Sequence, residues 1–219
     1  MNWFPVYLTL KVASLATAAA LLIGIPLAWL LARRKLPLTD LFGSIVTLPM
    51  VLPPTVLGYY LLLLIGRQSP VGRLLEERWG IVLVFTWQAA VVAAAVVAVP
   101  LVVRSTQAAF EAVDPHLEAA ARTLGRSELS VFGSITVPLA WKGILAGTVL
   151  AFARAMGEFG ATLMVAGNIP NRTQTLSIAI YDAVQAGNDS LANALVLLIS
   201  LLTVAVLLIV SRVARVPGW

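Results

Sequence analysis

The sequence has no cysteine and little charge. Without cysteine the chain has no disulfide framework, no thiol chemistry and no cysteine metal site. Charged residues make up only 11% of the 219 residues, whereas 60% are hydrophobic, compared with about 45–50% apolar residues in an ordinary soluble domain. This composition excludes an ordinary soluble domain and predicts that lipid is the main solvent of the folded chain.

Common catalytic motifs are also missing from the sequence. There is no GxxxxGK(S/T) phosphate loop, so we expect that this chain does not hydrolyse ATP by itself. There is no HExxH, no GxSxG and no cluster of metal ligands, so we expect no catalytic residue, no bound metal and no cofactor. The net charge of +5 would suggest nucleic acid as a partner of a soluble protein. Because the basic residues lie mostly beside the ends of apolar runs, we expect no nucleic-acid partner.

Several apolar runs reach the roughly 20 residues that a helix needs to cross a bilayer, and no alternating pattern suggests a barrel. The first run is too long for a signal peptide and ends in basic residues, so we expect it to be a span rather than a cleaved leader. The region 157–193 is mixed and is either re-entrant or a sixth crossing. Full spans are expected at 7–32, 41–65, 81–103, 135–156 and 194–210.

Positive charge predicts the topology. The densest cluster, Arg33-Arg34-Lys35, follows the first span, and Arg212 and Arg215 follow the last. By the positive-inside rule these ends lie in the cytoplasm, which places the N-terminus outside. The polar stretch 66–80 is then expected to be an outer loop. Against the rule, four arginines fall outside in this topology: Arg67, Arg73, Arg78 and Arg172.

Prolines interrupt the second expected span. Pro49, Pro53 and Pro54 stand in LPMVLPPTVLGYY, and each removes a backbone donor that lipid cannot replace. We therefore expect a kinked or partly unwound helix. Pro49, Pro53, Pro54 and Thr55 are candidates for shaping a translocation path, with a simple kink as the alternative.

Residues 105–134 break the hydrophobic pattern but keep apolar residues at helical spacing. They predict short amphipathic helices on the cytoplasmic side, and a solvated loop is the alternative. Asp114-Pro115 is a start signal, with Asp as N-cap and Pro at the first helical position. No soluble domain remains beside the spans, so residues 1–219 are expected to form a single transmembrane domain.

The stretch Glu118–Pro138, EAAARTLGRSELSVFGSITVP, resembles the EAA loop of ABC-importer permeases. Gly125, Ile135 and Pro138 match the family pattern at its spacing, after the Glu118, Ala119 and Ala120 that open the motif. Two positions depart: the acidic residue is Glu118 instead of position 119, and Val137 replaces the usual leucine. The resemblance implies that 105–134 is a coupling region that docks on a separate ATPase, with a sharp turn at Gly125.

A second resemblance covers nearly the whole chain. AFARAMGEFGATLMVAGNIPNRTQTLSIAIY at 151–181, together with LPMVLPPTVLGYYLL, is similar to the molybdate branch of the oxyanion importers. It implies an all-α, type I importer-like bundle of about five to six spans in a bacterial-type inner membrane. The implied partners are a second copy of the chain, two ATPases that use ATP and Mg²⁺, and an outer substrate-binding protein. Sulfate, thiosulfate or tungstate are alternative substrates, and an ATP-independent transporter or channel is the alternative class.

Charged residues and glycines near the fourth span are further path or gate candidates. Arg154 and Glu158 are four residues apart and are expected on one helical face near the end of the fourth span, and charges inside a membrane usually face a bundle interior or water. A structural ion pair is the alternative. Gly157 and Gly160 provide either close packing or a hinge. Lys11, near a span end, is expected to snorkel to the interface.

Overall fold

The fold is helical throughout the residues that the computed structural model describes, which are 2–33 and 39–215. The expected all-α class is therefore confirmed for these residues, whereas Arg34 and Lys35 of the basic cluster lie outside them. The helices are α1 (Phe4–Ala32), α2 (Thr39–Val51), α3 (Pro54–Ile65), α4 (Pro70–Trp79), α5 (Trp87–Glu111), α6 (Pro115–Thr123), α7 (Glu128–Val131), the π-helix η1 (Phe132–Thr136), α8 (Val137–Met156), α9 (Gly160–Ala166), α10 (Leu176–Gln185) and α11 (Asp189–Arg215).

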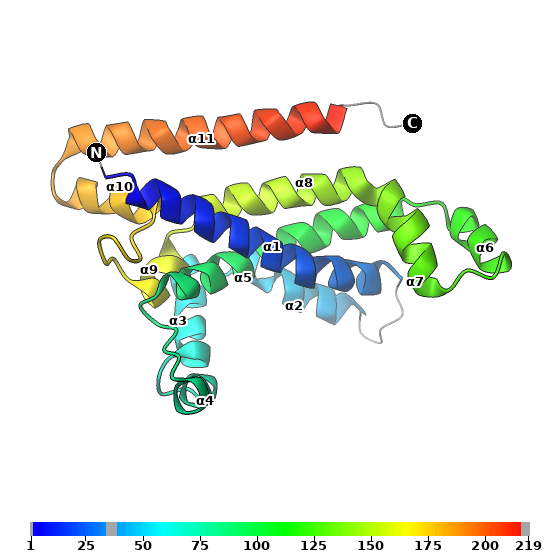
Figure 1. The fold of residues 1–219 in the computed structure, drawn as a ribbon, viewed down its shortest axis with the longest axis horizontal. Helices are drawn as coiled ribbons and strands as arrows, with labels where there is room; N and C mark the ends of the chain where they lie inside the picture. The colour runs from blue at the N-terminus through cyan, green and yellow to red at the C-terminus, as the bar shows by residue number, and fades with distance from the viewer. Residues whose placement is uncertain (1, 34–38, 216–219) are drawn as a thin grey trace.

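The centre of the molecule is a bundle of α1, α5 and α8 (Figure 1). Small residues line its contacts: Ala16 and Ala20 of α1 and Ala90, Ala94 and Ala98 of α5 are completely buried. In lipid, helices gain little from hiding apolar side chains, so close backbone approach and good packing hold them together. The alanine-rich composition of the third expected span thus has a direct structural use.

Two glycines of α8 bring it against α5. A β-carbon added to Gly143 would lie 2.3 Å from the Ala109 β-carbon, and one added to Gly147 would lie 3.0 Å from the Ser105 β-carbon. The Ser105 hydroxyl also donates a hydrogen bond to the Gly143 carbonyl at 2.8 Å. The α5–α8 contact therefore has no room for a larger residue at position 143.

Replacing Gly143 with valine is expected to destabilise the bundle by about 1–3 kcal/mol, the usual cost of overpacking. The measurement is thermal unfolding of the purified chain in detergent, followed by size-exclusion chromatography. Ala146 is exposed on the same helix, so Ala146→Val is the matched control and should unfold like the wild type. Equal unfolding temperatures for the two variants would contradict this packing.

Four helices are long and apolar enough to cross a membrane within the described part of the chain: α1, α5, the run Glu128–Met156, and α11. A fifth crossing is possible if α2 and α3 count as one broken span, because they are bent by 112° at the prolines. The expected break is confirmed and is sharper than a kink. With about 10 and 15 Å of length, α9 and α10 are too short to cross alone, so region 157–193 contributes no sixth straight span.

The limits of the third expected span were wrong at both ends. The helix α5 starts at Trp87 rather than near 81, because Thr86 caps it with its hydroxyl, which accepts a hydrogen bond from the Ala89 amide at 3.3 Å. It then continues to Glu111, past the predicted end at 103. The first seven residues of the polar region 105–134 therefore belong to α5, since its buried face continues through Thr106 and Phe110.

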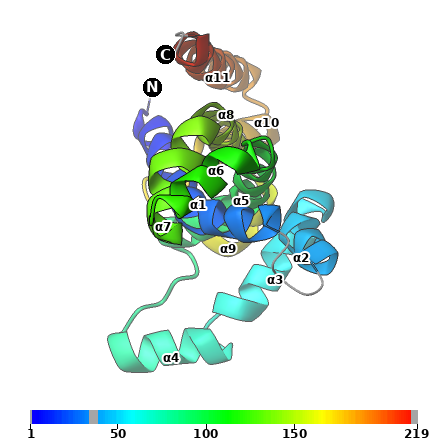
Figure 2. The ribbon, with the colours of Figure 1, turned by 90° about the vertical axis from the view of Figure 1, so that its right-hand side faces the viewer.

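The connection at 66–80, expected as an outer loop, contains a short helix, α4, that was not predicted. Ser69 caps its start by accepting from the Gly72 amide at 2.8 Å, and Gly80 ends it with a φ of +65°. Figure 2 shows α4 standing away from the central bundle.

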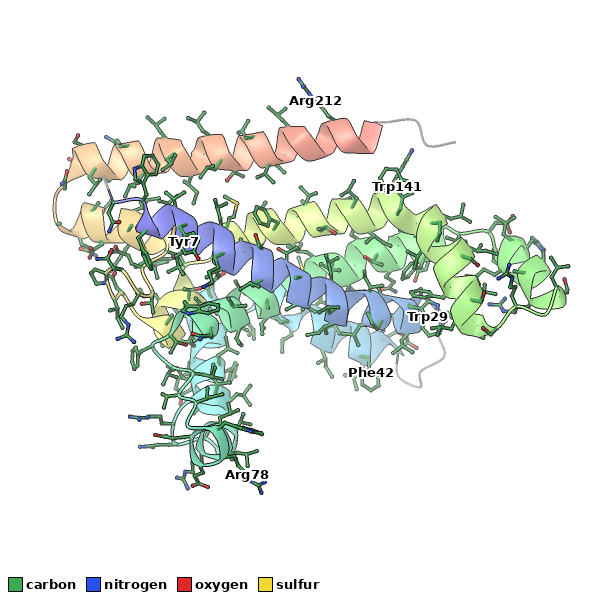
Figure 3. The ribbon with its side chains drawn as sticks, in the orientation of Figure 1. Tyr7, Trp29, Phe42, Arg78, Trp141 and Arg212 are labelled. Carbon is green, nitrogen blue, oxygen red and sulfur yellow. The ribbon has the colours of Figure 1, made fainter. Side chains whose placement is uncertain are left out.

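The molecule has two distinct ends. The start of α1 lies at one end, and α6 and α7 lie at the other (Figure 1). The exposed Arg212, near the end of α11, points outward on the far side of α11 from the bundle (Figure 3). The helical path Glu128–Met156 is 29 residues long, about 43 Å, and connects the two ends.

Candidate functional site

The helices α6 and α7 form a hairpin, residues 114–131, at one end of the bundle. The Asp114 carboxylate caps α6 by accepting from the His116 amide at 2.9 Å, as expected from the sequence. Gly125 has a φ of +80°, and the amides of Gly125 and Arg126 donate to the carbonyls of Arg122 and Ala121. No atom lies within 4 Å of a β-carbon added at Gly125. Glycine is therefore needed here for its backbone conformation and not for space.

Glu118 is the centre of an ion-pair network that fixes this hairpin to the bundle. Both carboxylate oxygens of Glu118 accept from Arg33, at 3.1 Å each, and one accepts from Arg122 at 3.2 Å. The Thr136 hydroxyl also donates to Glu118. Glu128 of α7 accepts from Arg122 at 2.6 Å and from Arg33 at 3.3 Å. One cluster thus connects the end of α1 with α6, α7 and η1.

The network has its own electrostatic consequence. Hydrogen bonding to Glu128, and then to Glu118, raises the pKa of the Arg122 guanidinium above its ordinary value. The Arg33 guanidinium lies 4.9 Å from the centre of the Trp29 ring, within range of a cation–π contact.

Three leucines of the hairpin are exposed. Leu117, Leu124 and Leu129 are 48%, 84% and 80% exposed. Scattered exposed leucines need no explanation, but these three lie on one short hairpin in a part of the chain that is rich in charge. The hairpin therefore carries an apolar surface that faces away from the rest of the chain.

The residues of the EAA-like stretch occupy different places. Ala119 and Ala120 are exposed on α6, Ile135 is half-buried in η1, and Pro138 is exposed at the second position of α8. The structure brings Glu118 against Thr136, which the sequence did not reveal. Arg33 was interpreted only as a topology signal, and no local pattern could have paired it with a residue 85 positions away.

The second candidate region surrounds the proline break between α2 and α3. Pro53 caps α3 with an extended backbone, and Pro54 is the first residue of the helix. A β-carbon at Gly160 would lie 2.8 Å from the Pro54 β-carbon, so this glycine serves close packing of α9 on α3. A β-carbon at Gly157 would meet only backbone oxygens at 3.8 Å or more. Close packing therefore accounts for Gly160 and not for Gly157.

Arg154 and Glu158 form an ion pair of 2.7 Å. The expectation that they share one helical face was wrong in detail, because α8 ends at Met156 and Glu158 follows that end. The Glu158 side chain is 2% exposed, and its second oxygen accepts from the Ala161 amide at 2.9 Å. Glu158 thus also satisfies an amide in the first turn of α9, in the manner of an N-cap.

Arg154 and the broken span meet at one cavity. A cavity of about 160 Å³ is lined by Arg154, Pro49 and Pro54, with Met50, Leu52, Val97 and Leu101 completing its wall. Of the predicted path residues, Pro49, Pro54 and Arg154 are therefore brought together. Pro53 and Thr55 are neighbours of Pro54 in the chain but do not line this cavity.

Replacing Arg154 with methionine is expected to destabilise the chain by about 1–3 kcal/mol, because it leaves the buried Glu158 carboxylate without a counter-charge. Thermal unfolding in detergent measures the effect. The double variant Arg154→Met/Glu158→Gln should recover part of the loss, since it removes the isolated charge. Additive losses in the double variant would mean that the two side chains do not act as a pair.

The sequence matches the profile of a known family over residues 24–216: the binding-protein-dependent transport system inner membrane component. The chain belongs to this family. The molybdenum transport system permease protein ModB of Escherichia coli K12 is 47% identical over 216 residues, which cover 98% of this permease and 94% of that protein. A putative molybdenum permease, YvgM of Bacillus subtilis, is 41% identical over 95% of this chain and 92% of its own length.

Solved structures agree on the fold. The permease superimposes on a chain of an inward-facing MetNI methionine ABC transporter with a TM-score of 0.73 at 19% identity, covering 98% of both chains. A bacterial ABC transporter for alginate gives a TM-score of 0.72 at 15% identity, covering 95% of this chain and 78% of that one. The expected ABC-importer permease fold is thereby confirmed, and the chain is a transport subunit.

Proposed function

We propose that this chain is the membrane permease of an ATP-driven molybdate importer. The observation that carries the substrate is the 47% identity to a molybdenum permease over nearly the whole chain. Two copies would line one path, two ATPases would bind ATP and Mg²⁺ on the cytoplasmic side, and an outer binding protein would deliver the anion. Sulfate, thiosulfate and tungstate are the alternatives within the same chemistry.

The proposed orientation places the start of α1 outside and the α6–α7 hairpin in the cytoplasm. The hairpin is then the ATPase-coupling element, and its exposed leucines are the surface that enters a groove on the ATPase. The apolar surface of Leu117, Leu124 and Leu129 supports this role, as does the rigid turn at Gly125.

Transmission of force follows the same elements. A movement of the hairpin would act on α1 through Arg33 and on α8 through η1, since Glu118 bonds to both Arg33 and Thr136. The continuous path Glu128–Met156 then ends two residues before Glu158. Pro53, Pro54, Thr55, Arg154, Gly157, Glu158 and Gly160 remain the proposed path or gate. A π-helix at the root of α8 gives this path a local irregularity of the kind often found at functional sites.

Uptake by reconstituted vesicles tests this proposal. Vesicles that contain the chain, its ATPase and internal ATP should accumulate radioactive molybdate from the loaded binding protein, and vanadate should stop the uptake. Omission of the ATPase should abolish it. Uptake that survives ATP depletion would overturn the importer and favour an ATP-independent transporter or channel.

A further inference from the structure

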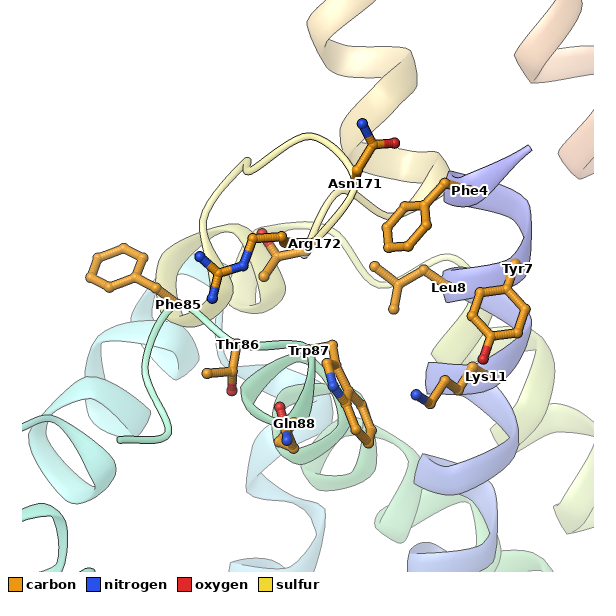
Figure 4. Close-up of a pocket in the computed structure, with 11 residues that line it drawn as sticks. Phe4, Tyr7, Leu8, Lys11, Phe85, Thr86, Trp87, Gln88, Asn171 and Arg172 are labelled. Atoms are coloured by element: carbon orange, nitrogen blue, oxygen red, sulfur yellow. The ribbon is translucent and has the colours of Figure 1, made fainter. Parts of the chain in front are cut away.

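A large cavity lies at the end of the bundle opposite the hairpin, which is the outer end in the proposed orientation. Its volume is about 490 Å³, and three distant segments line it: the first turns of α1, the start of α5, and the loop between α9 and α10. Figure 4 shows Lys11 of α1 and Arg172 of the loop extending towards the start of α5 from different sides. Neither residue takes part in the coupling or gate regions described above.

In the described part of the chain, neither cation of this cavity has an acidic partner. No aspartate or glutamate lines the cavity, and within residues 2–33 and 39–215 neither Lys11 nor Arg172 forms a salt bridge. The Lys11 ammonium instead lies 3.7 Å from the centre of the Trp87 ring, so snorkelling does not fully describe it. Two uncompensated cations at one cavity favour an anionic ligand.

The start of α5 adds to this preference. Thr86 caps the helix, and Trp87 and Gln88 occupy its first two positions on the cavity wall. The first amides of a helix have no intrahelical partner, and the helix dipole is positive at this end. The 25-residue α5 thus presents its positive end between the two cations, in an arrangement suited to phosphate-like anions.

The cavity wall is held in an unusual backbone conformation. Phe85 and Asn171 have φ values of +60° and +58°, and they are the non-glycine residues with positive φ in the described parts of the chain. Both line this cavity. Such conformations persist where the surroundings enforce them, and they concentrate at functional sites.

Hydrogen bonds hold both strained segments in place. The Asn2 side-chain amide donates to the Asn171 side chain at 2.8 Å, and the Phe85 amide donates to the Val165 carbonyl at 2.9 Å. The Thr173 hydroxyl accepts from the Ile169 amide at 3.1 Å, which closes the loop that carries Arg172. The cavity is therefore a preformed feature of the fold.

We propose that this cavity is a receiving site for a tetrahedral oxyanion on the outer face of the permease, held by Lys11, Arg172 and the start of α5. The identity of that anion as molybdate rests on the proposed function, whereas the site itself selects for negative charge. A volume of 490 Å³ exceeds one such anion, so the anion keeps part of its water shell. The site therefore binds weakly and releases its ligand readily.

Tryptophan fluorescence of the purified chain with its ATPase tests the site directly. An anion that draws Lys11 away from Trp87 changes the emission of that ring, so titration with sodium molybdate should give a saturable signal that Trp87→Phe removes. Arg172→Gln should weaken the apparent affinity about tenfold, the effect of one lost charge-assisted hydrogen bond. Arg67→Gln, in the turn before α4, is the matched control and should leave the titration unchanged. A wild-type chain without a saturable signal would overturn the site.

Two further variants protect the test against misfolding. Arg172→Lys keeps the charge and should retain most of the affinity, while Lys11→Gln should weaken it as Arg172→Gln does. Thermal unfolding at the wild-type temperature establishes that each variant is folded. Equal affinities in the wild type, Lys11→Gln and Arg172→Gln would contradict the assigned ligands.

Nanodiscs of different lipid composition distinguish a free oxyanion from the phosphate group of a lipid. Nanodiscs with and without phosphatidylglycerol should give the same molybdate titration if a free oxyanion occupies the site. Competition by phosphatidylglycerol would assign the site to a lipid phosphate and overturn the receiving role. Arg172→Gln could instead leave the molybdate titration unchanged and require more binding protein for half-maximal ATPase stimulation. That result would assign this surface to docking of the binding protein and would also overturn the receiving role.

Failure of the site and failure of the proposed function give different results. Molybdate uptake by vesicles without a fluorescence signal would reject the site and leave the importer intact. A signal with molybdate or sulfate but no uptake of molybdate would leave the oxyanion site intact and reject the assigned substrate.

Discussion

Replacing Glu118 with glutamine is expected to uncouple ATP hydrolysis from transport. The variant retains the shape of the side chain but removes the charge that accepts from Arg33 and Arg122. The amide N–H groups of glutamine can also face the guanidinium N–H groups of Arg33 and Arg122, so that donor meets donor. Loss of one charge-assisted hydrogen bond corresponds to about a tenfold effect, and we expect at least this reduction in uptake per ATP hydrolysed. The measurement is simultaneous uptake and phosphate release in vesicles.

A nearby carboxylate provides the control. Glu111 lies at the end of α5 and accepts from Gln107 at 2.9 Å, outside the Glu118 network. Glu111→Gln should transport at close to the wild-type ratio. A Glu118→Gln variant with normal uptake per ATP would show that the network only stabilises the hairpin and transmits nothing.

Replacing Gly125 with valine is expected to weaken docking of the ATPase about tenfold or more. Valine is β-branched and strongly disfavours a φ of +80°, with a strain of about 1–3 kcal/mol. The turn would relax and rotate α6 relative to α7, which moves the exposed Leu124 and Leu129 out of register. The measurement is copurification of the ATPase with a tagged permease, together with thermal unfolding of the spans.

Gly133 provides the matched control for Gly125. It also has no atom within 4 Å of an added β-carbon, but its backbone is helical in η1 and has no positive φ. Gly133→Val should therefore retain the ATPase. Gly125→Asn should retain most of it, because asparagine tolerates the left-handed conformation. Normal copurification of Gly125→Val would count against the hairpin as the docking element.

Local signals in the sequence predicted much of this fold. Asp114-Pro115 and Gly125 affect only the backbone of neighbouring residues. Capping and turn preferences therefore predicted the start and the end of α6 correctly. The prolines of the second span predicted a break for the same reason, because their effect on the backbone is local.

The failures share a different cause. The predicted end of this span at 103 was wrong because the buried face of α5 continues to Phe110, and α5 packs against α1 and α8. Glu118 gained its partner Arg33 through tertiary packing, and Lys11 gained Trp87 in the same way. Contacts between residues that are 76 or more positions apart leave no periodic trace in a single sequence. The roles of the coupling and path residues stay predictions until variants are measured.

The most direct test is ATPase stimulation of the reconstituted complex by binding proteins loaded with molybdate, tungstate or sulfate, measured side by side. Stimulation by the molybdate-loaded protein alone is the predicted result. Stimulation by sulfate alone would keep the permease architecture and contradict the substrate, and no stimulation by any loaded protein would contradict the importer itself.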